Sequence, residues 1–313
     1  MLRIASLNVN GVRAAHRRGL DDWLATRGCE VVALQEVRCP LDALPDGAFG
    51  DYHVVYEPGQ VAGRNGVAVL TRHRPVAVRT WDADVLVRAP DEDHLHTEAA
   101  PDDVPLARGL GAHAREGRYV EVDLAEAPIT VASLYLPKGG LPADLQVAGR
   151  MRGEPDGGAR YERKMRFLDA FARQLSRTRR AAARRGREFL LLGDLNLAHT
   201  RHDVAGWRRN QRAEGFLPEE RDWIDAQLSP RTLVDVVRSL HPDTDGPYSW
   251  WSWLGQAYAR DAGWRIDYHL ATPRLARTAR TAVVDRDHRG VRLSDHAPVV
   301  VDYDVPHGAG VTR

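Results

Sequence analysis

The stretch "LLLGDLNLAHT", residues 190–200, begins as an apolar run and then presents a carboxylate and a carboxamide, Asp194 and Asn196. A short apolar run with polar residues at its end predicts a buried strand that closes on a functional edge. In a strand, residues i and i+2 point to the same face. We therefore expect Asp194 and Asn196 to reach the same place.

The N-terminal stretch "SLNVNG", residues 6–11, has the same form, with Asn8 and Asn10 two positions apart after an apolar run. No exact internal repeat is present, but the two stretches form a weak two-fold echo. Two strand ends of this kind can converge on one site. The sequence therefore predicts a shared polar site built from both halves of the chain.

Strand-like and helix-like segments alternate along the chain, which indicates α/β layers. The strand-like segments are 3–9, 30–37, 53–57, 66–72, 119–124, 129–136, 188–196, 233–240, 264–272 and 298–305, and helices are expected at 16–27, 160–183 and 219–227. Residues 82–117, rich in acid and proline, and 139–158, rich in glycine, are expected to be surface-loop insertions. Neither has the composition of a linker between two cores, so we expect one domain over 1–313.

Composition excludes several classes of protein. With 313 residues, 43% of them hydrophobic, the chain can bury a large core without disulfides or a structural metal. The two cysteines, Cys29 and Cys39, have no partner cluster, and the chain shows neither a signal segment nor a membrane-length apolar run. We expect a soluble cytoplasmic protein without membrane contact. The net charge of +1 leaves nucleic-acid binding to local groups of charge.

Basic residues are almost all arginine, since only Lys138 and Lys164 among the 44 are lysine. This bias is typical of a GC-rich genome. The run at 177–187, "RTRRAAARRGR", is read first as the solvated face and end of a helix.

Four carboxylates are expected at strand ends: Glu36, Asp194, Asp267 and Asp295. Burying a carboxylate costs several kcal/mol unless it is paired, hydrogen-bonded or bound to a cation. Mg²⁺ prefers such oxygen ligands, and the asparagines would add neutral oxygens or N–H donors. The alternative, that each acid only closes a turn or caps a helix, is reasonable for any one of them but loses force for the set.

His296 follows Asp295 directly and shares the set with Asp267. A lone histidine would more often be a packed or turn residue. Beside an orienting carboxylate it becomes a candidate acid or charge stabiliser. The aromatic cluster "YSWWSW", 248–253, with Trp264 is core in its simplest interpretation, although some of these rings could offer flat surfaces to a sugar or base.

Seven motifs in this order resemble the exonuclease III type of abasic-site endonucleases in the endonuclease/exonuclease/phosphatase superfamily. They are "LNVNGVRA", "LQEVRC", "SLYLPKGG", "GDLNLAH", "EGFLPEER", "WRIDYHLAT" and "LSDHAPVV". The match as a whole runs from residue 2 to about residue 303. The resemblance implies a four-layer α/β sandwich of the deoxyribonuclease I type, with two mixed sheets face to face and helices outside. It also implies Mg²⁺-dependent hydrolysis of DNA phosphodiesters, with Mn²⁺ as a substitute.

The resemblance also implies roles for individual residues. Glu36 would be the principal metal ligand with Asn8 beside it, and a second metal could use Asp194, Asn196 and Asp295. Asp194 would prepare the attacking water, and Asn196 would help to hold the water and the phosphate. Tyr135 would contact the phosphate region, and Asp267 would orient a phosphate-binding His296.

DNA contacts are expected from residues beside the motifs. They are Asn10, Arg13, Arg38 and Lys138. The resemblance also implies that Trp250 and Trp264 lie around a pocket for an extruded abasic sugar. Lys138 follows "YLP" where relatives carry an amide, and the acidic insertion at 82–117 is long for a DNA-binding face. Both departures bear on the balance of activities rather than on the central set.

The expected function is that of a monomeric DNA-repair nuclease that cleaves double-stranded DNA 5′ to abasic sites, with 3′–5′ exonuclease and 3′-phosphatase activity at 3′ ends. One alternative keeps the fold but acts on a lipid or inositol phosphate, against which "WRIDYHLAT" and "GFLPEER" count. The other is a catalytically dead DNA-binding module. The presence of Glu36, Asp194, Asp267 and His296 together speaks against that.

Overall fold

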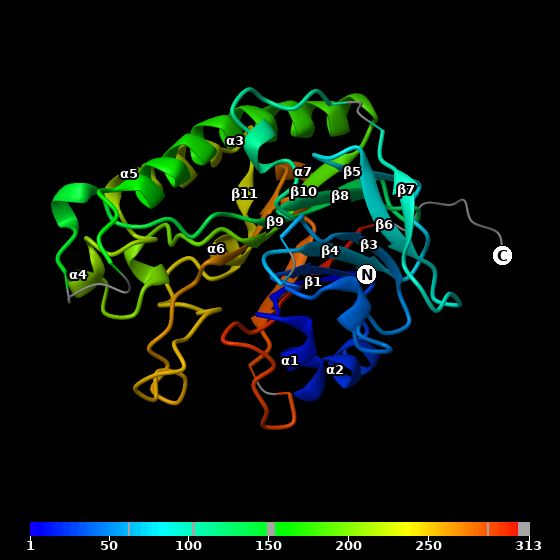
Figure 1. Ribbon diagram of the computed structural model, residues 1–313, viewed down its shortest axis with the longest axis horizontal. Coiled ribbons are helices and arrows are strands. Elements are labelled where there is room, and N and C mark those ends of the chain that lie inside the picture. Colours follow the sequence, from blue (N-terminus) through cyan, green and yellow to red (C-terminus); the bar gives the residue numbers. More distant parts are fainter. Residues whose placement is uncertain (62, 102–103, 149–153, 287, 306–313) are drawn as a thin grey trace.

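The computed structural model contains two mixed β-sheets packed face to face, with helices on both outer sides (Figure 1). It describes residues 1–61, 63–101, 104–148, 154–286 and 288–305. Figure 1 shows α3 along one side of the sandwich and α1 and α2 along the other. The predicted four-layer α/β sandwich is confirmed.

The eight-stranded sheet, called sheet A here, contains both ends of the described chain, because β1 pairs with β14. Its strands, in spatial order, are β13 (Ala279–Val284), β14 (Val299–Tyr303), β1 (Leu2–Asn8), β2 (Val31–Gln35), β4 (Val67–Thr71), β3 (His53–Glu57), β6 (Asp84–Arg88) and β7 (His96–Ala99).

The six-stranded sheet, called sheet B here, is built from the middle of the chain. Its order is β11 (Val234–Asp235), β12 (Asp267–Ala271), β10 (Glu188–Asp194), β9 (Ile129–Tyr135), β8 (Tyr119–Asp123) and β5 (Ala77–Thr80). Valine, leucine and isoleucine side chains from both sheets form the shared core between them. Such β-branched and aliphatic residues suit strands that are buried on both faces.

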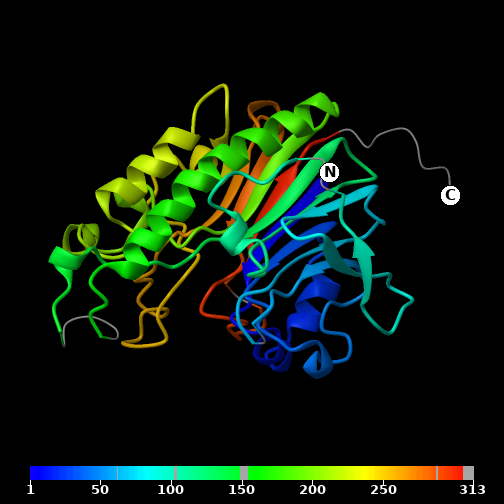
Figure 2. The same ribbon diagram turned by 45° about the horizontal axis from the view of Figure 1, so that its top comes forward.

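Helices cover the outer faces of the two sheets. The α-helices are α1 (Val12–Arg17), α2 (Leu20–Thr26), α3 (Ala159–Arg184), α4 (Trp207–Asn210), α5 (Pro218–Gln227), α6 (Val236–Leu240) and α7 (Pro273–Ala276), and the 3₁₀ helices are η1 (Leu41–Ala43), η2 (Gly111–His113), η3 (Ala143–Leu145) and η4 (Arg201–Asp203). α1 and α2 pack on sheet A, whereas α3 and α5 lie side by side over sheet B (Figure 2). Among the described residues, no helix combines the length and apolar composition needed to cross a membrane.

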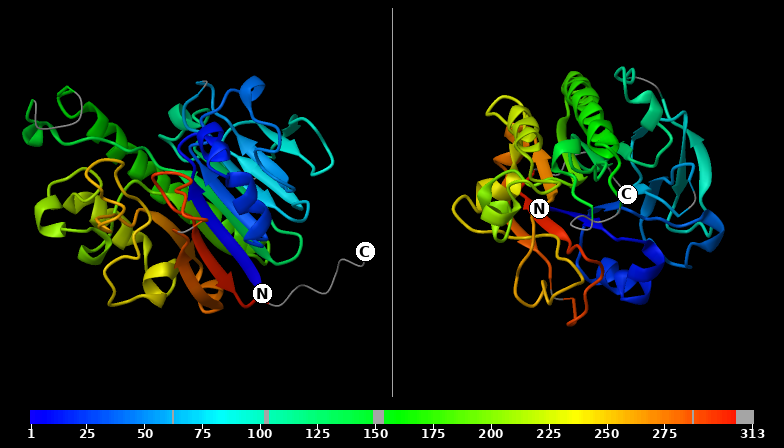
Figure 3. Two further views of the ribbon diagram at one scale, coloured as in Figure 1. Left: turned by 90° about the horizontal axis from the view of Figure 1, so that it is seen from below. Right: turned by 60° about the vertical axis from the view of Figure 1, so that its left-hand side comes forward.

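The two-fold echo of the sequence corresponds to matching strand neighbours in the two sheets. β1 is parallel to β2 and antiparallel to β14, and β10 is parallel to β9 and antiparallel to β12. β1 is the third strand of sheet A counted from β13, and β10 is the third strand of sheet B counted from β11. Figure 3 shows the two sheets and their helices from two further sides. β1 and β10 therefore occupy equivalent central positions, and both end at the edge that carries the polar motifs.

Three expectations about local structure need correction. The segment 82–117 contains β6 and β7, which extend sheet A, because Val85 and Val87 of "DVLVR" bury their side chains on one face. Residues 102–103 of this segment and 149–153 of the segment 139–158 lie outside the described residues. The expected helix 16–27 is two helices, separated at Gly19 with its φ of +93°. The expected strand 233–240 is a two-residue strand followed by α6, since Asp235 caps the helix by accepting the Arg238 N–H.

Candidate active site

One amide group joins the polar ends of the two sheets. The Asn8 side-chain nitrogen, at the end of β1, donates to Glu36 Oε1 at 2.8 Å and to Asp194 Oδ2 at 2.9 Å. Glu36 follows β2 directly, and Asp194 ends β10. Asn8 and Asp194 are buried. The predicted convergence of distant strand ends on one place is therefore confirmed by direct contacts between them.

The turns that follow β1 and β10 have the same backbone geometry. Asn8 Oδ1 accepts the backbone N–H of Asn10 at 2.9 Å, and Asp194 Oδ1 accepts that of Asn196 at 2.8 Å. Asn10 and Asn196 both adopt left-handed backbone angles, with φ of +44° and +48°. Asparagine tolerates this region better than most residues. Each turn thus ends its strand and sets the direction of the asparagine two residues later, Asn10 or Asn196.

The predicted same-face geometry does not account for these pairs, because Asn10 and Asn196 lie beyond the ends of their strands. Glu36 and Arg38, after β2, also have positive φ values, of +51° and +50°. Such backbone strain in non-glycine residues is concentrated at functional sites and costs about 1 to 3 kcal/mol per residue. The four positions Asn10, Glu36, Arg38 and Asn196 all lie at or beside the carboxylates of the site.

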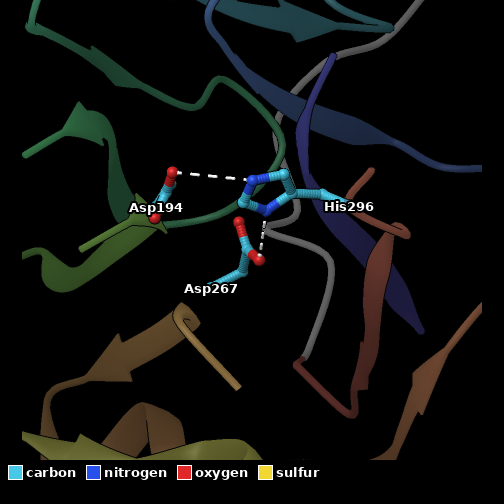
Figure 4. A group of neighbouring side chains, drawn as sticks. All are labelled: Asp194, Asp267 and His296. Carbon is cyan, nitrogen blue, oxygen red and sulfur yellow. Dashed lines mark hydrogen bonds and ion pairs between the residues drawn. The ribbon is translucent and has the colours of Figure 1, made fainter. Parts of the chain in front are cut away.

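His296 lies between two aspartates (Figure 4). Its Nδ1 is 2.8 Å from Asp267 Oδ2, and its Nε2 is 3.8 Å from Asp194 Oδ2. All three residues are buried. Ligand atoms of this group lie within 4.8 Å of one another, a spacing that could hold a metal ion. The short contact to Asp267 instead favours an oriented imidazolium that faces Asp194.

Burial and neighbouring charges shift the protonation equilibria of this group. Burial raises the pKa of Asp194 to about 7, Asp267 and Glu36 add to the rise, and His296 opposes it. Burial alone would lower the pKa of His296, but the attraction of Asp267, Asp194 and Asp295 raises it to about 10. Near neutral pH the site therefore holds a charged imidazole beside a carboxyl group that can exchange its proton.

Tyr135, the last residue of β9, places its hydroxyl group near the carboxylates. Burial, together with the negative charges of Glu36 and Asp194, raises the pKa of Tyr135 well above its usual value. The Arg118 guanidinium lies 5.5 Å from the centre of the Tyr135 ring and donates to the Tyr135 carbonyl at 3.1 Å. Tyr135 therefore stays a neutral hydrogen-bond donor at physiological pH.

Asp295 is held by groups from two segments far apart in the sequence. It accepts hydrogen bonds from Asn10 Nδ2 at 2.9 Å and from Trp250 Nε1 at 3.1 Å. Burial opposes ionisation, but His296 and these two donors lower the pKa of Asp295. Arg38 joins the same network, because it donates to Asn10 Oδ1 at 2.7 Å and to Glu36 Oε2 at 3.1 Å.

The carboxylates line a cleft with a volume of about 560 Å³. The predicted residues that line it are Glu36, Tyr135, Lys138, Asp194, Asn196, Trp250, Trp264, Asp295 and His296. The Trp250 and Trp264 rings meet edge to face, with centroids 6.5 Å apart, and Phe216 packs against Trp264. The cleft thus combines an acidic floor with aromatic walls.

Three arginines that line the cleft were not singled out from the sequence: Arg160, Arg209 and Arg212. Arg160 lies in the first turn of α3, and the other two lie in and after α4. The sequence signal was the basic run "WRRNQR" just before "EGFLPEER". Arg13, by contrast, is exposed on α1 and is absent from the described residues that line the cleft.

The donor set at the edge of the sheets suits a hard divalent cation. Glu36, Asp194 and Asp295 line the cleft, and neither cysteine lines it, since both are buried with the core around α1 and α2. Oxygen-only sites favour Mg²⁺, Mn²⁺ or Ca²⁺ over softer metals. Asn8 turns its nitrogen, and not its oxygen, toward the carboxylates. The residues present therefore fit a divalent cation near Glu36.

Comparisons with known proteins agree with this geometry. A family model described as "Endonuclease/Exonuclease/phosphatase family" matches residues 5–296, which include both turns and the histidine. The chain belongs to this family. The exodeoxyribonuclease of Bacillus subtilis (strain 168) is 27% identical over 300 residues, which cover 95% of this chain and 98% of the relative.

Two further comparisons point to the same branch of the family. The DNA-(apurinic or apyrimidinic site) endonuclease of Dictyostelium discoideum is 25% identical over 97% of this chain and 71% of its own. The structure of an AP endonuclease from Archaeoglobus fulgidus has a TM-score of 0.72 and 25% identity, and it covers 97% of this chain and 100% of its own. The resemblance to the exonuclease III and abasic-site endonuclease branch is confirmed, and with it the assignment to the nuclease hydrolases.

Proposed function

We propose that this chain is a divalent-metal-dependent DNA-repair nuclease that hydrolyses the phosphodiester 5′ to abasic sites in duplex DNA. We include 3′–5′ exonuclease and 3′-phosphatase activity in the proposal, because the same site could act on a phosphate at a 3′ end. The observation that carries it is the buried Asp194, bonded to Asn8 and facing His296 at the floor of a cleft with basic and aromatic walls.

Asp194 is proposed to orient the attacking water and accept its proton. Its raised pKa, about 7, makes it a stronger base than an exposed aspartate, and general-base catalysis is most efficient when the pKa lies near the working pH. Asn8 and the backbone N–H of Asn196 hold its two oxygens in a fixed direction. The water would therefore meet a carboxylate that needs little reorganisation.

Charge on the phosphate is proposed to be offset by His296, Tyr135 and Asn196. The imidazolium of His296 is oriented by Asp267, and Tyr135 keeps its hydroxyl proton. The Asn196 amide donates one proton to the Leu136 carbonyl at 2.9 Å, which leaves its second N–H for the cleft. Fixed donors of this kind stabilise the charge that develops in the transition state.

A divalent cation bound near Glu36 would neutralise phosphate oxygens and stabilise the leaving 3′-oxygen. We propose Glu36 as its principal ligand. Asp194, Asn196 and Asp295 are candidates for a second cation, and Asn8 acts chiefly by positioning Glu36 and Asp194. Mg²⁺ is the proposed physiological ion, with Mn²⁺ as a substitute.

DNA is proposed to bind across the cleft through its backbone, with the abasic sugar against Trp250 and Trp264. Lys138, Arg160, Arg209 and Arg212 supply positive charge beside the site. Arg38 can serve the same purpose only in part, because it already pairs with Glu36. We propose that residues 1–313 act as one domain and as a monomer, in a reducing cytoplasmic compartment that suits the free thiols of Cys29 and Cys39.

The test is a cleavage assay on an end-labelled duplex with one abasic analogue. We expect one nick 5′ to the lesion with Mg²⁺, none with a chelator, and none on the matched undamaged duplex within the same time. Asp194→Asn should remove the nick. Equal cleavage by this variant would exclude Asp194 from the mechanism, and cleavage of a lipid or inositol phosphate in place of abasic DNA would overturn the proposed substrate.

A further inference from the structure

The side chain of Lys164 is buried on α3 directly behind the candidate active site. It is 1% exposed, and its ammonium group donates to the Asn196 carbonyl oxygen at 2.8 Å and to Glu220 Oε1 at 2.6 Å. Glu220, in α5, is fully buried as well. A buried charge of this kind must be paired and hydrogen-bonded to be tolerated. The pair therefore meets the active-site turn from the inside of the protein.

The turn at Asn196 depends on partners for each of its polar groups. Its backbone N–H bonds to Asp194, its amide bonds to Leu136, and its carbonyl faces the interior, where Lys164 is the donor. Its left-handed φ of +48° is a less populated conformation that these contacts help to hold. Removing the ammonium would leave a buried carbonyl oxygen without its donor, which favours a different backbone conformation of the turn.

Lys164 also supports a second part of the cleft. A β-carbon added at Gly139, whose φ is +92°, would lie 2.5 Å from Lys164 Cδ, so the backbone of the loop after β9 rests on the lysine stem. The same loop carries Lys138 into the cleft. Glu220 in turn accepts the Leu217 N–H at 3.0 Å, which fixes the start of α5. One buried side chain thus joins three segments around the site.

The equivalent turn in the other half of the molecule has no such support. Within the part of the chain that the structure describes, no side chain donates to the carbonyl of Asn10, whose own turn is half-buried at the surface. Of the 44 lysine and arginine residues only two are lysines, and both lie at this site. The compact ammonium group can donate along three directions within a small space.

We propose that Lys164, held by Glu220, is a positioning residue that locks the Asn196 turn for catalysis. It acts through the Asn196 carbonyl and does not touch the substrate. The inference rests on the proposed nuclease function for its kinetic consequence, but not for its structural one. Without the lock, Asn196 and the carboxylate of Asp194 would lose their fixed orientation, and misplacement by about 1 Å can cost about 100-fold in rate.

The variant Lys164→Met/Glu220→Gln tests the structural part. Methionine keeps most of the apolar stem, and glutamine keeps an oxygen for Leu217, so no buried charge is left unpaired. We expect the backbone amide of Asn196 to exchange its hydrogen at least about tenfold faster by NMR, while the amide of Asn10 exchanges as in the wild type. Unchanged exchange at Asn196 would overturn the proposal.

The kinetic part is measured on the abasic duplex, at a temperature where each variant is folded by circular dichroism. We expect kcat to fall at least about tenfold with KM within about twofold, since the lost interaction acts in the transition state. Arg166→Gln, on the exposed face of the same helix, is the matched control and should keep both parameters. Wild-type kcat in the double variant would overturn the positioning role.

Glu220→Gln alone is the second variant, for use where the double variant does not fold. It keeps the Lys164 bond to Asn196 but leaves the ammonium without its counter-charge, and it should give a smaller change in Asn196 exchange and in kcat. Full wild-type values of both in this folded variant would also contradict the proposal. A wild-type protein that cleaves no DNA would refute the proposed function, while the exchange measurement would still decide the role of Lys164.

Discussion

The turn after β1 and the turn after β10 share one backbone geometry but carry different chemistry. In each, a side-chain oxygen accepts the N–H two residues later, and the second residue is an asparagine with left-handed φ. The first turn begins with Asn8, and the second begins with Asp194. The amide of Asn8 donates to the carboxylate of Asp194, so the two turns meet face to face.

This difference shows how one structural element can serve two purposes. The turn of sheet A supplies neutral donors that hold carboxylates in place. The turn of sheet B supplies the carboxylate itself, with His296 and Asp267 beside it. An amide at both positions would leave no base, whereas acids at both would repel each other in a buried place. The asymmetry of the two halves is therefore the basis of the proposed chemistry.

The largest expected effect comes from exchanging the two residues that differ. Asp194→Asn should lower kcat on abasic duplex by about 1,000-fold, the usual range for loss of a general base. The swap Asn8→Asp/Asp194→Asn keeps one acid and one amide, but places the acid in the turn of sheet A. We expect it to remain as inactive as Asp194→Asn in the same assay.

Recovery of activity in the swap variant would show that the two turns are chemically interchangeable. Circular dichroism and thermal unfolding of each variant serve as the control for folding. A difference in activity between folded variants then reports the chemistry of the two turns and not a loss of stability.

The alkaline limb of the pH dependence should come from the pair His296 and Asp267 beside the turn of sheet B. His296 is protonated below its raised pKa of about 10, so the rate should fall as pH rises through that value. Asp267→Asn removes the largest contribution to that rise, so the alkaline limb should move to lower pH, and the rate at pH 8 should fall by about 100-fold. A pH profile of kcat checks this.

Asn8→Ala is the matched variant in sheet A for the pH profile. It should lower the rate without moving the alkaline limb. An unmoved limb in Asp267→Asn would contradict the assignment of the limb to His296.

The residue before each turn differs between the two sheets, and its contribution can be measured as a change in the free energy of unfolding. Gly193 pairs with Leu134 in β9, and a β-carbon at Gly193 would lie 1.9 Å from the Leu134 carbonyl oxygen, whereas Leu7 is accommodated beside Leu34 in sheet A. Gly193→Ala should therefore lower the free energy of unfolding by about 2 to 3 kcal/mol, as overpacking does. Urea denaturation measures this change.

Gly186→Ala is the control for that variant. Gly186 also has a positive φ, of +72°, but its β-carbon would meet open space. We expect its loss to be smaller, about 1 to 2 kcal/mol, from the left-handed backbone alone. Equal losses in the two variants would show that strand contact at Gly193 is not the cause.

The smallest effect is expected from Asn10→Ala. This change removes hydrogen bonds to Asp295 and Arg38 at the half-exposed turn. One such bond contributes about 1 kcal/mol, so KM for the abasic duplex should rise by about fivefold. Asn196→Ala, its counterpart in sheet B, should lower kcat instead, and the same steady-state measurements distinguish the two outcomes.

Much of this comparison was predictable from sequence, because strand ends and apolar runs have local signatures. The pairing of "SLNVNG" with "GDLNLA" predicted a shared site, and the contact between Asn8 and Asp194 confirms it. The reason given by strand periodicity was wrong. Each strand ends at the first residue of its polar pair, Asn8 or Asp194. A bond from that side chain to the backbone then sets the direction of the second residue, which periodicity does not describe.

Other features depended on tertiary contacts that one segment does not contain. Residues 233–240 have a run that suits either a strand or a helix, and the cap formed by Asp235 decides for the helix. Strands β6 and β7 were taken for loop because acid and proline surround them. In the sequence, Lys164 resembles any other basic residue on a helix that faces solvent. Only the position of α3 over sheet B shows that its side chain is buried.

The most direct test of the central claim is a double-mutant cycle between the two turns, measured as kcat on the abasic duplex. The variants are Asn8→Ala, Asp194→Asn and the two combined. If both halves act as one unit, the combined variant should be about as slow as Asp194→Asn alone, because Asn8 then has no carboxylate to position. If the combined loss equals the product of the two separate losses, the turns act independently and the account is contradicted.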